Sequence, residues 1–231
     1  MKKILTSALL SATILGAGLV VSSNVNAATV DQKATTNTDV KFVGGTDPID
    51  PVDPTDPTKP TKPTDPGTGN QGPLAIIYAT KDISFGQDNK ITATKATLTA
   101  DKNIAVEVGD VRGNNAGWAL SVKSDQLSDG ATTAPKVLKG AVISLAEGAS
   151  VVANSGTSVK ATTKALSDTI TGGVVLDAAG IIKDTGESQG SGINVDTIAK
   201  DGITLTVPAG SATADVAYKS VLTWTLSDVP A

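Results

Sequence analysis

The chain has 231 residues, of which 39% are hydrophobic and 18% charged, so it is long enough for one or two domains with a buried core. Its net charge of −4, with scattered lysines and a single arginine, argues against the clustered basic face that binding to nucleic acid requires. It has no cysteine and no histidine, which excludes disulfides, catalytic triads with histidine and the usual zinc sites. The apolar residues are mostly Ala and Val, which favours strands.

The first 27 residues resemble a secretory signal peptide. Lys2 and Lys3 precede an apolar run at residues 4–21, and small residues at Val25 and Ala27 predict cleavage before Ala28. An uncleaved membrane anchor is the alternative, but Ser, Thr and Gly interrupt the run and no charged stop follows it. Removing the segment takes away two lysines and no acid, so the net charge becomes −6. No second apolar segment of spanning length follows, and we expect an exported, soluble mature protein.

A proline-rich segment follows a short predicted strand at residues 38–43. In that strand Val40 and Phe42 alternate with polar residues. From residue 48 to residue 66, proline recurs at every third position, and Asp precedes five of these seven prolines. Polyproline II has three residues per turn, so the spacing predicts a stiff, solvated rod of roughly 60 Å if fully extended. A calcium site at these Asp residues is the alternative to a spacer.

From Leu74 onward the sequence alternates between short β-rich runs and clusters of Gly, Asn, Asp and Pro. Residues 127–135 and 183–192 are predicted loops, and no sustained helical period occurs after the signal. The pattern predicts an all-β fold, a single antiparallel β-sandwich or barrel-like domain. The predicted strands lie within residues 74–80, 90–100, 103–111, 117–124, 136–146, 150–156, 172–178, 202–210 and 218–229.

The two tryptophans occur in matching contexts. Trp118 shares a strand face with Leu120, and Trp224 shares one with Leu226, because alternate residues of a strand point the same way. A Trp flanked by aliphatic residues favours a core position. A sugar-binding platform, which requires an exposed ring, remains open, as does a groove at which the two Trp meet partly buried, with one edge packed and one accessible.

The pair Trp118-Ala119-Leu120 and Trp224-Thr225-Leu226 resembles the WxL cell-surface domain of low-GC Gram-positive bacteria. Residues 72–86 and 202–218 and the Asp-Pro-rich stretch are also similar to that family, so the resemblance covers residues 28–231. It implies one domain in which the proline-rich segment, residues 46–72, is a long loop and the strand at 38–43 completes the sheet.

The resemblance also implies non-covalent attachment to the bacterial cell wall through peptidoglycan, with a membrane-anchored surface protein as a further partner. Trp118, Leu120, Trp224 and Leu226 are the binding residues that it implies. The alternative is a structural or adhesive subunit whose main contact is that protein partner.

We expect no catalysis, no cofactor and no metal. A glycosidase needs two carboxyl groups held about 5 to 10 Å apart. The only Glu residues are Glu107, Glu147 and Glu187, and the Asp residues occur mainly in the proline-rich segment and in turns, where backbone geometry explains them. No phosphate-binding Gly pattern is present either.

Overall fold

The computed structural model describes residues 33–59, 63, 66–154 and 156–231. The predicted signal peptide, residues 1–27, and its cleavage site lie outside these residues. The chain divides into one unit that ends at Lys41 and a second that runs from Phe42 to Ala231. The described part of the first unit, residues 33–41, is exposed and has no regular secondary structure.

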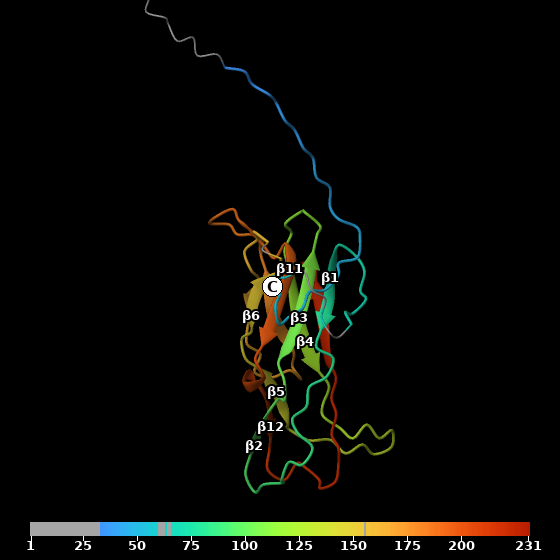
Figure 1. Cartoon of the computed structure of the whole chain (residues 1–231). Coiled ribbons are helices and arrows are strands. Elements are labelled where there is room, and N and C mark those ends of the chain that lie inside the picture. Colours follow the sequence, from blue (N-terminus) through green and yellow to red (C-terminus); the bar gives the residue numbers. More distant parts are fainter. Residues whose placement is uncertain (1–32, 60–62, 64–65, 155) are drawn as a thin grey trace, which may run out of the picture. The chain divides into compact units, whose positions relative to one another are not determined.

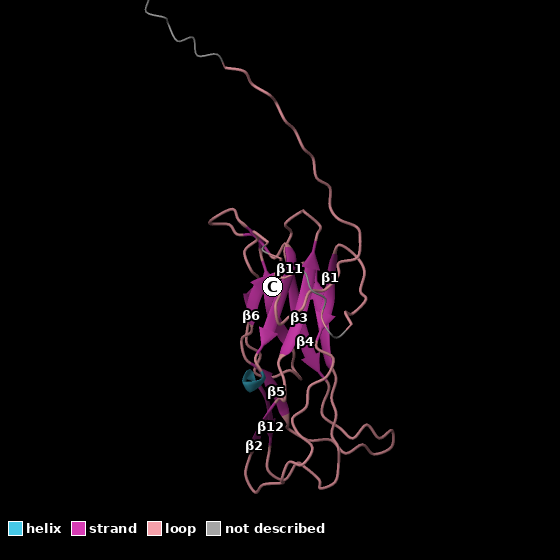
Figure 2. Cartoon of the chain, viewed as in Figure 1, coloured by secondary structure: helices cyan, strands magenta, loops and turns pink. Residues whose placement is uncertain are grey.

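The fold is all-β, as the sequence predicted (Figure 2). The described residues hold one short 3-10 turn, Lys200–Gly202, and otherwise only strands. These strands are β1 (Leu74–Ala79), β2 (Ala96–Thr99), β3 (Ile104–Asp110), β4 (Trp118–Ser124), β5 (Val142–Leu145), β6 (Ala149–Val152), β7 (Thr162–Thr163), β8 (Gly173–Ala178), β9 (Gly180–Ile181), β10 (Ser188–Gln189), β11 (Gly192–Ile198), β12 (Ile203–Val207) and β13 (Leu222–Ser227).

Two four-stranded sheets form the main body of the second unit (Figure 1). The first, with strand order β1-β3-β11-β6, is called the β3 sheet, and the second, with order β13-β4-β8-β7, is called the β4 sheet. A three-stranded sheet, β2-β12-β5, and the short pair β10-β9 accompany them, and all these strand pairings are antiparallel. Shared core residues show that the β3 and β4 sheets pack face to face, as in an antiparallel sandwich.

The core between the sheets consists of small aliphatic side chains at alternate positions. Val106 and Val108 of β3 pack in one cluster with Leu120 and Val122 of β4. Ile203 of β12 belongs to the same cluster, so the three-stranded sheet extends the core beyond the sandwich. The β-branched composition of the sequence therefore fills a sheet interface, where such side chains pack well.

The proline-rich segment differs from the predicted solvated rod. Val52 is only 4% exposed and packs with Val195 of β11 on the outer face of the β3 sheet. The N–H of Val52 donates to Glu107 Oε2 at 3.0 Å. Ile49 lies directly over Gly109, since a Cβ added to Gly109 would be only 2.7 Å from the side chain of Ile49. The described part of this segment therefore covers the sheet as a strap, because its two aliphatic residues offer apolar surface to bury.

Turns also interrupt the expected period-three conformation. The N–H of Asp56 donates to the carbonyl of Asp53 at 3.0 Å, and that of Lys59 donates to the carbonyl of Asp56 at 3.1 Å. A polyproline II helix has no such internal hydrogen bonds. Asp and Thr side chains stabilise the first turn, since Thr55 donates to Asp53 Oδ1 through both its N–H and its hydroxyl.

The predicted strand at residues 38–43 is wrong for this structure. These residues form no strand, and the side chains of Val40 and Phe42 are 78% and 86% exposed. Alternation of apolar and polar residues supplies one face for burial, but a strand also needs a neighbour that satisfies its backbone groups.

One central strand was missed from the sequence. β11 lies between β3 and β6, yet residues 183–192 were predicted to be a loop and residues 193–198 were given no strand. Its apolar and polar residues do alternate, but their faces are inverted: buried Asn194 and Asp196 lie on the inner face, and Val195 lies on the outer face under Val52. The predicted strands at 90–100 and 136–146 are also shorter in the structure, where the strands span Ala96–Thr99 and Val142–Leu145.

Candidate functional site

The two W-x-L segments lie on neighbouring strands, β4 and β13. Leu226 stands directly opposite Leu120 in the ladder, and Trp224 stands opposite Val122. Because the strands are antiparallel, Trp118 lies two residues from the leucine pair in one direction along the sheet, and Trp224 lies two residues from it in the other direction. The two Trp are therefore four residue positions apart along the strands. At 3.3 Å per residue this is a separation of about 13 Å along the strands. The motifs therefore meet through their leucines.

Trp118 is part of the core. Its side chain is 0% exposed, and its Nε1–H donates to the carbonyl oxygen of Gly190 at 3.0 Å. Gly190 has a φ of +82°, and a Cβ on it would lie 2.3 Å from the Cβ of Ala178 and 2.9 Å from Trp118 Nε1. Only glycine fits this position, so the polar end of the indole is satisfied by a backbone built around it.

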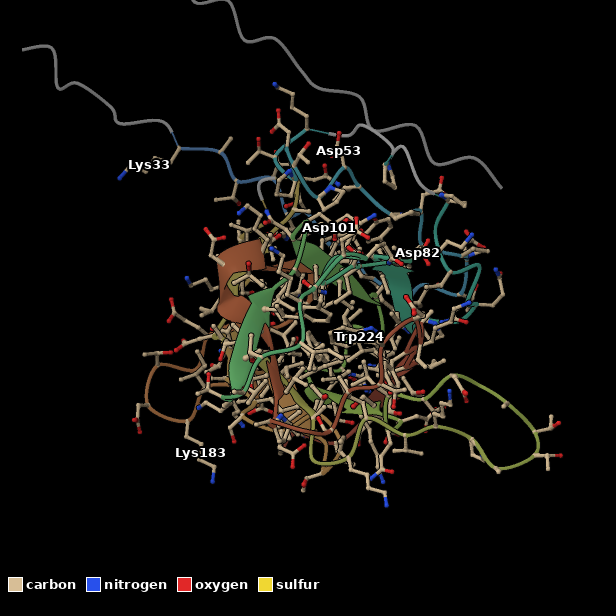
Figure 3. The ribbon with its side chains drawn as sticks, turned by 90° about the horizontal axis from the view of Figure 1, so that it is seen from below. Lys33, Asp53, Asp82, Asp101, Lys183 and Trp224 are labelled. Carbon is tan, nitrogen blue, oxygen red and sulfur yellow. The ribbon has the colours of Figure 1, made fainter. Side chains whose placement is uncertain are left out.

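Trp224 lies in a different environment. Its side chain is partly buried and packs against the core cluster from the edge strand β13. Figure 3 shows it within the packed side chains of the sandwich, away from the outlying loop that carries Lys183. It also lines an open groove of about 700 Å³ where β13 faces the edge strand β1, together with Leu74 and Ile76 of β1. The two Trp therefore do not meet at a groove: Trp224 lines it, whereas Trp118 is fully buried in the core.

The groove also has polar walls. Asn70, Gln71, Arg112 and Asp228 line it, beside Thr225 and Ser227 of β13. Amide, guanidinium and carboxylate groups around a half-exposed ring can hydrogen-bond to hydroxyl groups while the ring contacts C–H surface. This combination suits a polar ligand that also presents apolar C–H surface, such as a sugar chain.

Arg112 is held in place by the end of β3. Its Nε and Nη2 donate to the two carboxylate oxygens of Asp110 at 3.0 and 2.8 Å, and Nη2 also donates to the carbonyl of Gly117 at 2.7 Å. The hydrogen bonds to Asp110 raise the pKa of Arg112 above its ordinary value. The bidentate pair fixes the guanidinium plane, so this wall of the groove is preorganised.

Sequence reasoning named two of the groove residues, Trp224 and Leu226, and placed Trp118 and Leu120 with them. The structure places these last two in the interior behind the groove. The polar wall was missed, because Asn70, Gln71 and Asp228 stand in turn-like contexts that carry no motif. Arg112, the only arginine of the chain, was the one available signal.

Two buried carboxyl groups lie elsewhere in the β3 sheet. Burial raises the pKa of Glu107 to about 7; the hydrogen bond from the Val52 N–H lowers this pKa, and the nearby charge of Asp53 raises it further. Burial also raises the pKa of Asp196 to about 6. Val195 stands opposite Glu107, so Asp196, its neighbour on β11, points to the other face of the sheet. The two groups therefore do not face each other across a site, as a glycosidase pair would.

Among the residues that the structure describes, no group of three or more Asp, Glu, His or Cys residues is arranged to hold a metal ion. The same residues contain no helix with the length and apolar character needed to cross a membrane.

The fold is an all-β domain with a groove between the edge strands β13 and β1 of two sheets. The family model described as "WxL domain surface cell wall-binding" matches residues 29–230, and the chain belongs to this family. It is thus a cell-surface protein with a cell-wall-binding domain. No curated protein and no solved structure matches the chain.

Proposed function

We propose that the chain is an exported surface protein that attaches non-covalently to the Gram-positive cell wall by binding peptidoglycan in the groove beside Trp224. The observation that carries this proposal is the partly buried Trp224 ring among Asn70, Gln71, Arg112 and Asp228. A glycan strand offers C–H surface for the ring and hydroxyl and amide groups for the polar walls.

Within the proposal the four W-x-L residues have different roles. Trp224 and Leu226 contact the ligand, since both line the groove. Trp118 and Leu120, each 0% exposed, hold β4 in place beside β13 and act as positioning residues. Binding here involves no catalytic step, which agrees with the opposite orientation of the two buried carboxyl groups with raised pKa values.

Co-sedimentation of residues 28–231 with protein-free peptidoglycan tests the proposal. We expect the chain to appear in the pellet. If the chain stays in the supernatant, the proposal of direct wall binding is wrong. The alternative is then favoured: the chain is a structural or adhesive subunit that a membrane-anchored protein partner retains at the surface.

A pair of matched variants tests the groove itself. Gln71→Ala removes an exposed polar group of the groove wall, whereas Gln87→Ala removes the same group from an exposed loop outside the groove. Losing one hydrogen bond of about 1 kcal/mol weakens binding about fivefold, so Gln71→Ala should reduce the pelleted fraction and Gln87→Ala should not. Equal binding by the two variants would place the wall contact elsewhere.

A further inference from the structure

The outer edge of β13 is open. β13 pairs only with β4, and the described residues make no backbone hydrogen bond to its other side. The Val221 carbonyl accepts from the N–H of Asp125, on the β4 side of the strand. Backbone groups alternate along a strand, so those of Leu222, Trp224 and Leu226 point away from β4 toward the open edge.

Other edges of the two main sheets are shorter or covered. The edge strand β1 is covered, since the N–H of Thr68 donates to the carbonyl of Ile77 at 3.0 Å. β7 has only two residues, and the N–H of Asn154, just beyond β6, donates to the carbonyl of Pro57. β13 has six residues and contains neither proline nor a charged residue. Proline and charged residues normally protect an edge strand from pairing with another chain, so β13 lacks this protection.

A complementary segment exists in the same sequence. Val40, Phe42 and Val43 are 78%, 86% and 85% exposed, and they are three of the eight large hydrophobic residues that are exposed among the described residues. Val221 and Val229, which flank β13, are two of the others, at 62% each. Most of the exposed large apolar surface thus belongs either to the segment at residues 38–43 or to the surroundings of β13.

We propose that residues 38–43 of one copy add as a strand to the β13 edge of a second copy. Val40 and Phe42 share one face, which would meet Trp224 and Leu226 in the groove, while Asp39 and Lys41 would point to solvent. The added strand satisfies the edge backbone groups and buries Val40 and Phe42 of the donor copy against Trp224 and Leu226 of the acceptor. Each copy carries one donor segment and one acceptor edge, so association produces either a reciprocal dimer or a head-to-tail chain.

Self-association goes beyond the proposed wall binding and is independent of it. Both use the side of the molecule that carries the groove, so a donor strand and a wall glycan should exclude one another. The test is therefore run without peptidoglycan, and its failure leaves the wall-binding proposal untouched.

Sedimentation equilibrium of residues 28–231 over a wide concentration range is the first measurement. We expect the mean mass to rise with concentration, and Phe42→Asp to weaken association at least about tenfold, because the burial of an aromatic side chain is lost. Ile91→Asp, which changes another exposed apolar residue outside both regions, is the matched control and should leave association unchanged. A monomer at all concentrations, or equal effects of the two variants, would overturn the proposal.

Disulfide trapping identifies the contact, since the chain has no cysteine of its own. Lys41→Cys in one copy is mixed with Thr223→Cys, Thr225→Cys or Ser227→Cys in another, three positions that sample the solvent-facing register of β13. We expect a mixed dimer with at least one of them and none with Ile181→Cys, an exposed position on β9. Equal trapping with Ile181→Cys would contradict the proposed contact. A Lys41→Cys/Thr225→Cys double variant that forms its disulfide only within one chain would show that the segment pairs with its own β13, which would overturn the proposal of a second copy.

Discussion

β4 and β13 carry the same W-x-L motif but differ in the number of strands beside them. β4 has β13 on one side and β8 on the other, whereas β13 has β4 alone. Trp118 is accordingly 0% exposed, while Trp224 is partly exposed in a groove. A motif repeated in sequence thus supplies a core residue in a central strand and a groove-lining residue in an edge strand, and the neighbouring strands decide which.

The largest expected effect comes from truncating the central tryptophan. Trp118→Ala removes a fully buried ring and its hydrogen bond to Gly190, and should lower the free energy of unfolding by about 4 kcal/mol. Urea unfolding followed by circular dichroism measures this loss. A loss below about 1 kcal/mol would contradict the core assignment of Trp118.

The next largest effect is a dependence of stability on pH, caused by Glu107 in the β3 sheet. The pKa of Glu107 in the folded chain, about 7, is above its ordinary value of 4.5, so the folded state binds the extra proton between these values. The free energy of unfolding should therefore fall as pH rises from about 4.5 to 7, by up to about 3 kcal/mol. Asp196, with a pKa raised to about 6 from 3.8, adds a fall over the lower part of this range.

Glu107→Gln isolates the Glu107 contribution, because an amide oxygen can still accept the Val52 N–H. In this variant the decline between pH 6 and 7 should disappear and the decline due to Asp196 should remain. Urea titrations at a series of pH values provide the measurement. Parallel curves for the variant and the parent chain would show that Glu107 is ionised and solvated in the folded state.

The smallest effect sharpens the comparison between the two motifs. Trp224→Ala removes a ring that is only partly buried, so we expect a loss of about 1 to 2 kcal/mol, together with a marked loss of peptidoglycan binding. Unfolding curves and co-sedimentation of the same preparation measure both quantities. A loss of stability equal to that of Trp118→Ala, with unchanged wall binding, would mean that both tryptophans are structural.

Prediction from sequence worked where an apolar or alternating run had turn residues at its ends. The runs that became β3, β4 and β13 have apolar residues at every second position, whereas those that became β1 and β8 are nearly continuous apolar runs. It failed for β11, which alternates but turns its polar residues Asn194 and Asp196 inward, and for residues 38–43, which alternate but have no strand beside them. It also failed for the proline-rich strap, where Val52 found a buried position that proline spacing does not show.

The sequence by itself determined the all-β class, the W-x-L strands and the likeness to a surface family, because these depend on local alternation, composition and motif. The tertiary structure alone decided which Trp is buried, which carboxyl groups lose their water and where Asn70, Gln71 and Arg112 meet Trp224. These properties depend on neighbours that are distant in sequence. Burial follows from strands on both sides, and the groove exists because the edge strands β13 and β1 of two packed sheets face each other.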